Sequence, residues 1–336
     1  MEAVQTGLWL VILLVGLALV FDFMNGFHDA ANSIATVVST GVLRPGQAVL
    51  FAAFFNVAAV FVFHLGVAAT VGRGLAQPGV VDVQVVFGAL CGAIAWNIIT
   101  WYYGIPSSSS HALIGGIVGA VIAKAGSSVL MVGNLAVIFA FILVAPVLGF
   151  VLSSLVMVAV AWLFRRARPL SVDHWFHRLQ LLSAGAYSLG HGGNDAQKTI
   201  GIIWMLLIAT GHTDPAAEAP PLWVIASCYA VMGLGTAFGG WRIVKTMGQK
   251  ITKLRAVGGF CAETGGAMSL FLATFFGIPV SSTHTITGAI IGVGSIQHAA
   301  AVRWGVAGNI VWAWILTIPA CAFMAALAYW VSHLWF

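Results

Sequence analysis

A polar stretch at residues 187–201 interrupts an otherwise apolar segment, residues 180–209, that is long enough to cross a bilayer. Its motif, Gly-Asn-Asp-Ala-Gln-Lys, places Asp195 and Lys198 three residues apart. A charged side chain at bilayer depth costs about 2.5–3.5 kcal/mol on insertion scales. We therefore expect these two opposite charges to serve function rather than packing.

The composition requires a membrane setting for this segment. Hydrophobic residues make up 60% of the 336 residues and charged residues only 7%, whereas a soluble domain carries about 25% charged residues. We predict an all-α integral membrane protein, because the apolar runs have the length of helices rather than of barrel strands. The net charge of +5 then concerns membrane orientation rather than nucleic acid. The four cysteines lie in apolar segments without metal-ligand spacing, and we interpret them as small core residues.

Two pairs of similar stretches indicate that the chain is an internal duplication. Residues 26–34 and 192–200 agree at four of nine positions, with an offset of 166 residues. Residues 104–119 and 277–292 agree at nine of sixteen positions, with an offset of 173 residues. Because both pairs occur in the same order along the chain, the two halves are expected to share one fold.

The duplication divides the chain into three parts. We predict a first membrane repeat at 1–164, a basic cytoplasmic linker at 165–179 and a second membrane repeat at 180–336. Each repeat has about five apolar segments, and an odd number of side changes makes the second repeat inverted relative to the first. This arrangement puts eleven basic residues on the side of the linker and two on the other. By the positive-inside rule the linker is cytoplasmic and both termini are external.

We expect broken helices at matching places in the two repeats. The first apolar segment contains a polar break at 25–32, and the sixth contains the stretch 187–201. The segments at 107–124 and 280–297 begin with hydroxyl residues and histidine and then continue as glycine-spaced apolar helix, which is typical of half-helices or re-entrant hairpins. Interrupted helices in inverted repeats are typical of a secondary transporter with its site at the midplane.

The hydroxyl clusters predict an anion site. Pro106 and Pro279 favour a helix start just after them. The hydroxyl residues that follow would then occupy N-cap or first-turn positions: Ser108, Ser109, Ser110, Ser281, Ser282 and Thr283. Two such helix starts facing each other offer free N–H groups and positive dipole ends to an anion. The alternative, that the hydroxyls merely cap buried helix ends, is weakened because the cluster occurs twice at repeat-related positions.

Three further residues in apolar segments are functional candidates. His111 and His284 follow the hydroxyl clusters, and we expect them to orient a hydroxyl or carboxylate rather than to contact substrate. Glu263 is an intramembrane carboxylate, which is a functional candidate by default. Its repeat-equivalent position holds Leu90, so this carboxylate occurs in one repeat only.

At these four motifs the chain resembles the inorganic phosphate transporter (PiT) family. The family's hallmarks are a paired Gly-Ala-Asn-Asp-Val-Ala-Asn-like motif and paired Pro-x-Ser-Ser/Thr-Thr-His-like segments. The resemblance covers nearly the whole chain and is greatest to the bacterial low-affinity phosphate permeases. It implies a multi-pass protein of the bacterial inner (cytoplasmic) membrane. It also implies that Asp29, Asn32, Asp195 and the hydroxyl clusters line the site for phosphate and the coupling ion.

The sequence departs from the sodium-type pattern at His28, at Gln197–Lys198 and at Leu90. An ammonium at position 198 would repel a bound sodium ion, and His28 can accept a proton near neutral pH or ligate a divalent metal. Carboxylates beside an anion site require cations or protons to enter with the anion. We therefore expect phosphate–proton symport, and a metal–phosphate complex is left open as the transported species. Sodium-coupled phosphate symport and sulfate permeation are the alternatives within the family.

The expected site residues fall into three groups. Substrate binding is assigned to Asn32, Ser108, Ser109, Ser110, Gln197, Lys198, Ser281, Ser282 and Thr283. Coupling-ion binding is assigned to His28, Asp29, Asn194, Asp195 and Glu263, and a metal site at His28, Asp29 and Asp195 is left open. His111 and His284 have the supporting role given above. Expected partners are inorganic phosphate and lipid, without nucleic acid or a resident cofactor, and a homodimer is compatible with the sequence.

Two other classes of protein fit the sequence less well. An intramembrane hydrolase would need a nucleophile and base such as Ser110–His111 or Thr283–His284, but the chain has no Gly-x-Ser-x-Gly or His-Glu-x-x-His motif. An ion channel usually builds its filter from symmetric subunits, whereas the symmetry here is internal and inverted. We therefore expect a transporter and not an enzyme.

Overall fold

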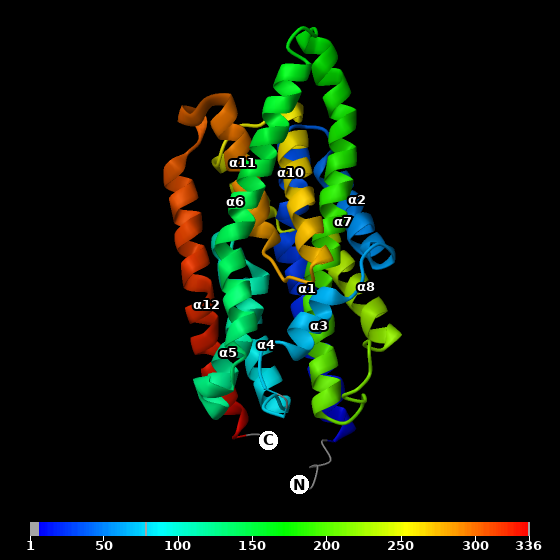
Figure 1. Cartoon of the computed structure of the whole chain (residues 1–336), viewed down its shortest axis with the longest axis vertical. Helices are drawn as coiled ribbons and strands as arrows, with labels where there is room; N and C mark the ends of the chain where they lie inside the picture. Colours follow the sequence, from blue (N-terminus) through cyan, green and yellow to red (C-terminus); the bar gives the residue numbers. More distant parts are fainter. Residues whose placement is uncertain (1–6, 78, 335–336) are drawn as a thin grey trace.

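The computed structural model describes residues 7–77 and 79–334, which form a bundle of helices (Figure 1). The first repeat contains α1 (Leu8–Ser39), α2 (Pro45–Ala58), η1 (Ala59–Phe61), α3 (Gly66–Arg73), α4 (Val83–Tyr103), α5 (Ser109–Ala125), η2 (Ser127–Val129) and α6 (Val132–Leu163). The second contains α7 (Pro169–Ala209), α8 (Leu222–Phe238), α9 (Trp241–Lys245), η3 (Thr246–Lys250), α10 (Ala256–Phe275), α11 (Ser282–His298), η4 (Ala299–Ala301) and α12 (Trp304–Ser332). In this described part, five helices are long and apolar enough to span a membrane: α1, α4, α6, α10 and α12.

The two repeats run in opposite directions. In Figure 1, α1 begins and α12 ends at the lower end of the bundle, while the turn between α6 and α7 lies at the upper end. Helix α1 therefore runs upward where its counterpart α7 runs downward. The predicted inverted repeat is confirmed. Only residues 164–168 separate α6 from α7, so most of the predicted linker at 165–179 is the first part of α7.

Helices α4 and α5 form a hairpin that enters the bundle and returns to the same side, and we call it the first hairpin. Lys124 near the end of α5 binds Asp82 at the start of α4, with Nζ 2.5 Å from Oδ2. The second hairpin, α10 and α11, is closed at its base in a similar way, because the Arg303 N–H donates to the Ile251 carbonyl at 2.9 Å. Figure 1 shows the two hairpins entering from opposite ends. The predicted re-entrant hairpins are therefore confirmed.

The predicted polar break at 25–32 is wrong. Helix α1 is continuous from Leu8 to Ser39, and α7 runs for 41 residues through the polar stretch. In both helices the backbone stays helical, and polar side chains such as Asn32 and Asn194 find partners on neighbouring segments. The chain bends elsewhere: by 82° between η1 and α3, and by 59° between α8 and α9. At the second bend Gly239 has φ +71°, a left-handed conformation that favours glycine.

Short helical segments hold the turns of the two hairpins. Helix α3 contacts the turn of the second hairpin, and η3, which follows α9, contacts the turn of the first. The Thr70 hydroxyl of α3 donates to the Gly277 carbonyl at 2.7 Å, and the Thr246 hydroxyl of η3 donates to the Gly104 carbonyl at 2.9 Å. Both glycines have left-handed backbones, with φ +65° at Gly104 and +67° at Gly277. Each repeat thus fixes the hairpin turn of the other repeat, and these turns lead directly into α5 and α11.

The predicted orientation of the chain can be tested by labelling single cysteines with an impermeant maleimide in intact cells, in a Cys91→Ala background. A cysteine at Ala216, in the exposed loop between α7 and α8, should react. Cysteines at the exposed positions Arg166 and Lys253 should react only after the membrane is permeabilised, because the positive-inside rule predicts that the basic loops are cytoplasmic. The reverse labelling pattern would show that the predicted orientation is wrong.

Candidate functional site

The starts of α5 and α11 lie inside the protein, where sequence analysis placed them. Ser108 and Ser281 are the N-cap residues, and their hydroxyls accept from the N–H groups of His111 and His284 at 3.2 Å each. Both N-caps are 1% exposed. The other N–H groups of a first helical turn have no partner within their own helix, and the positive end of the helix dipole lies there. Two positive helix ends are thus buried between the repeats.

Each helix start contacts the aspartate of the polar motif in its own repeat. The Ser109 hydroxyl donates to Asp29 Oδ1 at 3.3 Å, and the Ser282 hydroxyl donates to Asp195 Oδ2 at 2.9 Å. These two pairs are related by the repeat offsets of 173 and 166 residues. All four side chains are at most 2% exposed. The duplication therefore builds the same serine–aspartate contact twice.

One position on each of α1 and α7, which we call the motif helices, contacts the helix start of the other repeat. The Asn32 amide on α1 donates to Ser282 Oγ at 3.3 Å and to Thr283 Oγ1 at 2.9 Å. Its repeat-equivalent, Lys198 on α7, donates to Ser110 Oγ. Each motif helix thus contacts the helix start of the other repeat. We call these side chains the central polar cluster: Asp29, Asn32, Ser109, Ser110, Asp195, Lys198, Ser282 and Thr283.

The ammonium of Lys198 is fully surrounded by oxygen atoms. It donates to Asp195 Oδ1 and Ser110 Oγ, and to the Val280 carbonyl at 2.7 Å. An ammonium has three donors, so its hydrogen-bonding capacity is filled. Lys198 is only 2% exposed, and Asp195 is 0% exposed. A buried charge is tolerated when it is paired and hydrogen-bonded in this way.

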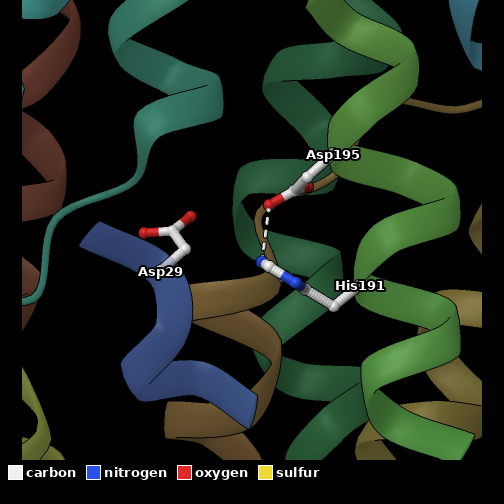
Figure 2. A group of neighbouring side chains, drawn as sticks. All are labelled: Asp29, His191 and Asp195. Atoms are coloured by element: carbon white, nitrogen blue, oxygen red, sulfur yellow. Dashed lines mark ion pairs between the residues drawn. The ribbon is translucent and has the colours of Figure 1, made fainter. Parts of the chain in front are cut away.

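His191 is a site residue that sequence analysis missed. Its Nε2 lies 3.1 Å from Asp195 Oδ2, and its Nδ1 lies 3.2 Å from Asn56 Oδ1. Figure 2 shows His191 and Asp195 on α7 facing Asp29 on α1. One ligand atom from each of these three residues lies within 4.8 Å of the others, so the group could hold a cation. The four-residue spacing of His191 and Asp195 on a helix was the available signal.

His28 and Asn194 occupy repeat-equivalent positions and contact the last turns of α4 and α10. The imidazole Nε2 of His28 lies 3.0 Å from Thr100 Oγ1, and its Nδ1 lies 2.8 Å from Asp29 Oδ1. The Asn194 amide donates to Thr274 Oγ1 at 3.0 Å, and its oxygen accepts from the Val280 N–H at 3.1 Å. His28 therefore touches the central polar cluster, whereas Asn194 contacts the turn of the second hairpin.

Two of the predicted site residues lie apart from this cluster. The Gln197 amide oxygen accepts from the N–H groups of Val67 and Ala68 at 3.0 and 3.2 Å, which fixes the start of α3. Glu263 accepts from Gln180 Nε2 at 2.9 Å and from Ser183 Oγ at 2.5 Å. Ser183 precedes Asp195 by twelve residues, or roughly 18 Å along α7. The roles predicted for Gln197 and Glu263 stay predictions.

The two histidines that follow the N-caps meet between the repeats. The ring centroids of His111 and His284 lie 4.4 Å apart, with the rings edge to face. The His284 ring stacks on Trp314, with 3.7 Å between the ring centroids. Their backbone N–H groups complete the serine caps, as described above. They pack the two helix starts against each other and make no side-chain hydrogen bond to the described carboxylates of the cluster. Their predicted orienting role stays a prediction.

Comparisons with known proteins agree over nearly the whole chain. The model of the phosphate transporter family matches twice, at residues 25–171 and 165–325. A probable low-affinity inorganic phosphate transporter from Rhizobium meliloti is 58% identical over 325 residues, which is 97% of each chain. One from Bacillus subtilis is 44% identical over 329 residues, covering 97% of this chain and 98% of the relative.

A solved structure shares this fold. It is described as the sodium-dependent phosphate transporter, and it matches with a TM-score of 0.89 and 26% identity. The match covers 98% of this chain and 100% of the other. The two family matches overlap at residues 165–171, in the loop after α6 and the first residues of α7, where the inverted repeats join. Together with the paired helix starts and the paired aspartates, these findings show that the chain is a multi-pass membrane transporter, not an enzyme, and belongs to the phosphate transporter family.

Proposed function

We propose that the protein is a secondary transporter that carries inorganic phosphate across the bacterial cytoplasmic membrane together with protons. The names of the bacterial relatives and the duplicated helix starts support phosphate as substrate. The observation that carries the coupling proposal is the Lys198 ammonium, which is buried between Asp195 and the two hairpins.

Phosphate is proposed to bind between the starts of α5 and α11. Two positive helix ends point into this region, and the hydroxyls of Ser109, Ser110, Ser282 and Thr283 line it. Hydroxyls and first-turn N–H groups donate to phosphate oxygens at helix starts. When the anion enters, these hydroxyls would exchange their present acceptors for phosphate oxygens. Asn32 and Lys198 then act as the donors that reach across from the motif helices.

Because carboxylates lie beside the proposed phosphate site, positive charge must enter together with the anion. Asp29 and Asp195 are each at most 2% exposed and contact the hydroxyls that would bind phosphate. Like charges at close range in a low-dielectric region repel strongly. Lys198 neutralises Asp195, but no fixed cation among the described side chains contacts Asp29. The proposed transport cycle therefore loads a cation or a proton near Asp29 before or together with phosphate.

Lys198 argues against sodium at the position next to Asp195. Its ammonium is bound by a carboxylate, a hydroxyl and a carbonyl oxygen, which are the kinds of ligand that a hard cation takes. The ammonium therefore fills the space that a small cation would occupy there. The corresponding position in the first repeat holds Asn32, whose Oδ1 is buried without a hydrogen-bond partner among the described residues.

His28 and His191 are the reason for proposing protons as the coupling ion. Each imidazole lies against one of the two aspartates, at 2.8 Å from Asp29 and 3.1 Å from Asp195. Imidazole is the side chain whose charge changes near physiological pH. The group of Asp29, His191 and Asp195 also supports a metal–phosphate complex as the transported species. Sodium coupling is the second candidate, because the structurally similar transporter is described as sodium-dependent.

The double variant Ser109→Ala and Ser282→Ala should reduce phosphate uptake by at least tenfold without changing membrane insertion. Each lost hydrogen bond to a charged group is worth about 1.5–3 kcal/mol, or ten- to a hundredfold in affinity. The measurement is the half-saturation concentration for radiolabelled phosphate in proteoliposomes. Ser227→Ala is the control, because that hydroxyl donates within α8 to the Val224 carbonyl. An unchanged half-saturation concentration in the double variant would place the phosphate site elsewhere.

Proteoliposomes also test the coupling ion. An inward proton gradient should drive phosphate accumulation in sodium-free buffer, and an inward sodium gradient alone should not. Lys198→Asn should introduce sodium-stimulated uptake, since it removes the ammonium and leaves the oxygen ligands around Asp195. Lys124→Asn is the matched control, because its partly exposed pair with Asp82 lies at the base of the first hairpin. If wild-type uptake follows only the sodium gradient and is insensitive to pH, proton coupling is wrong.

A further inference from the structure

A cavity of about 540 Å³ lies against the turn of the first hairpin, apart from the central polar cluster. Its walls come from the end of α4, residues 104–106 of the turn, η3 and the first half of α12. Small-molecule sites in proteins occupy about 300–1,000 Å³, so the cavity has the size of a ligand site.

The exposed side of the cavity lies between helices that we expect to face the hydrocarbon of the membrane. Its rim includes Tyr103 on α4 and Trp312 and Leu316 on α12. These side chains are 70%, 64% and 53% exposed, respectively, on helices that would face lipid. Helix α12 forms the left edge of the bundle in Figure 1. An occupant can therefore enter from the bilayer without crossing water.

One end of this apolar cavity is polar and positively charged. Lys250 at the end of η3 and Asn309 on α12 both line it, and both are exposed. The Lys250 ammonium has no hydrogen bond or ion pair with any residue that the structure describes. Asn309 follows Arg303 by six residues, so this end lies toward the side of the basic loops. A cation beside an apolar cavity at that depth complements an anionic lipid headgroup whose acyl chain fills the cavity.

The duplication does not explain this cavity. The equivalent place in the other half, between α6 and the second hairpin, holds a cavity of only about 120 Å³. It is lined by apolar side chains and Ser269, with no charged residue. The volume and the lysine are therefore specific to the side next to the first hairpin.

We propose that this cavity binds one anionic phospholipid from the leaflet on the side of the basic loops. The headgroup phosphate lies at Lys250 and Asn309, and an acyl chain lies between α4 and α12 against Trp312 and Leu316. The bound lipid braces residues 104–106, which lead into the N-cap Ser108. The cavity wall also includes Thr100, which contacts His28. The proposal does not depend on the coupling ion or on the phosphate site.

Native mass spectrometry of the purified protein tests the proposal, with phosphatidylglycerol and phosphatidylcholine of matched chains as probes. Wild type should retain phosphatidylglycerol in preference to phosphatidylcholine. Lys250→Gln should lower phosphatidylglycerol retention about fivefold, which is the effect of one basic residue near an anionic headgroup. Ala313→Phe, which fills the cavity, should remove both lipids. Lys253→Gln is the matched control, since Lys253 is exposed but does not line the cavity.

Three outcomes would overturn the proposal. Equal phosphatidylglycerol retention in wild type, Lys250→Gln and Ala313→Phe would show that the cavity holds no lipid. Displacement of phosphatidylglycerol by inorganic phosphate would show that Lys250 binds a free anion. Conversion of a dimer to a monomer by Ala313→Phe, with no lipid bound in either form, would show that the cavity receives a second copy of the chain. The two variants alter opposite ends of the cavity, so a folding failure in one leaves the other as the test.

Discussion

The buried pair of Asp195 and Lys198 is the interaction on which the centre of the molecule depends. No water is present in the hydrocarbon to satisfy an ammonium, so its donors must be filled by the protein. They are filled by three segments: α7 itself, the start of α5 and the residue before the N-cap of α11. Both hairpin turns must therefore reach the middle of the bundle for Lys198 to be tolerated. The sharp glycine turns at Gly104 and Gly277 are what bring them there.

Much of the fold could be predicted from the sequence because its signals are local. A proline followed by hydroxyls specifies a helix start wherever it occurs, and its repetition at 104–119 and 277–292 revealed the duplication. The continuity of α1 and α7 could not be predicted in the same way. Polar residues inside an apolar run indicate that something must be satisfied, but not whether the backbone or only the side chains need partners. That depends on neighbours distant in sequence, such as Ser282 for Asn32.

The candidate site shows the same division between local and distant information. Sequence analysis found the aspartates and the hydroxyls, because they repeat. It did not find that positions 32 and 198 reach across to the opposite repeat, since no spacing records which helix start faces which motif. His191 was missed for a related reason: its repeat-equivalent is Asn25, so the duplication gave it no emphasis. Gln197 has polar chemistry suited to a substrate, but the structure uses its amide to fix α3.

The positions at which the two repeats differ have consequences that the shared fold alone does not have. Two identical inverted repeats would give inward- and outward-facing arrangements that are equivalent by symmetry, because exchanging the roles of the repeats exchanges the sides of the membrane. Two pairs of buried, repeat-equivalent positions remove that equivalence. Lys198 corresponds to Asn32, and Glu263 corresponds to Leu90. The charge of Lys198 tolerates a change in surroundings poorly, since removing the partner from a buried ion pair costs about 3–5 kcal/mol. A movement that separates the α5 start from α7 would have to replace the Ser110 oxygen on Lys198. The phosphate that we propose binds between the helix starts is itself an anion able to do so, and this would link its arrival to release of the hairpin.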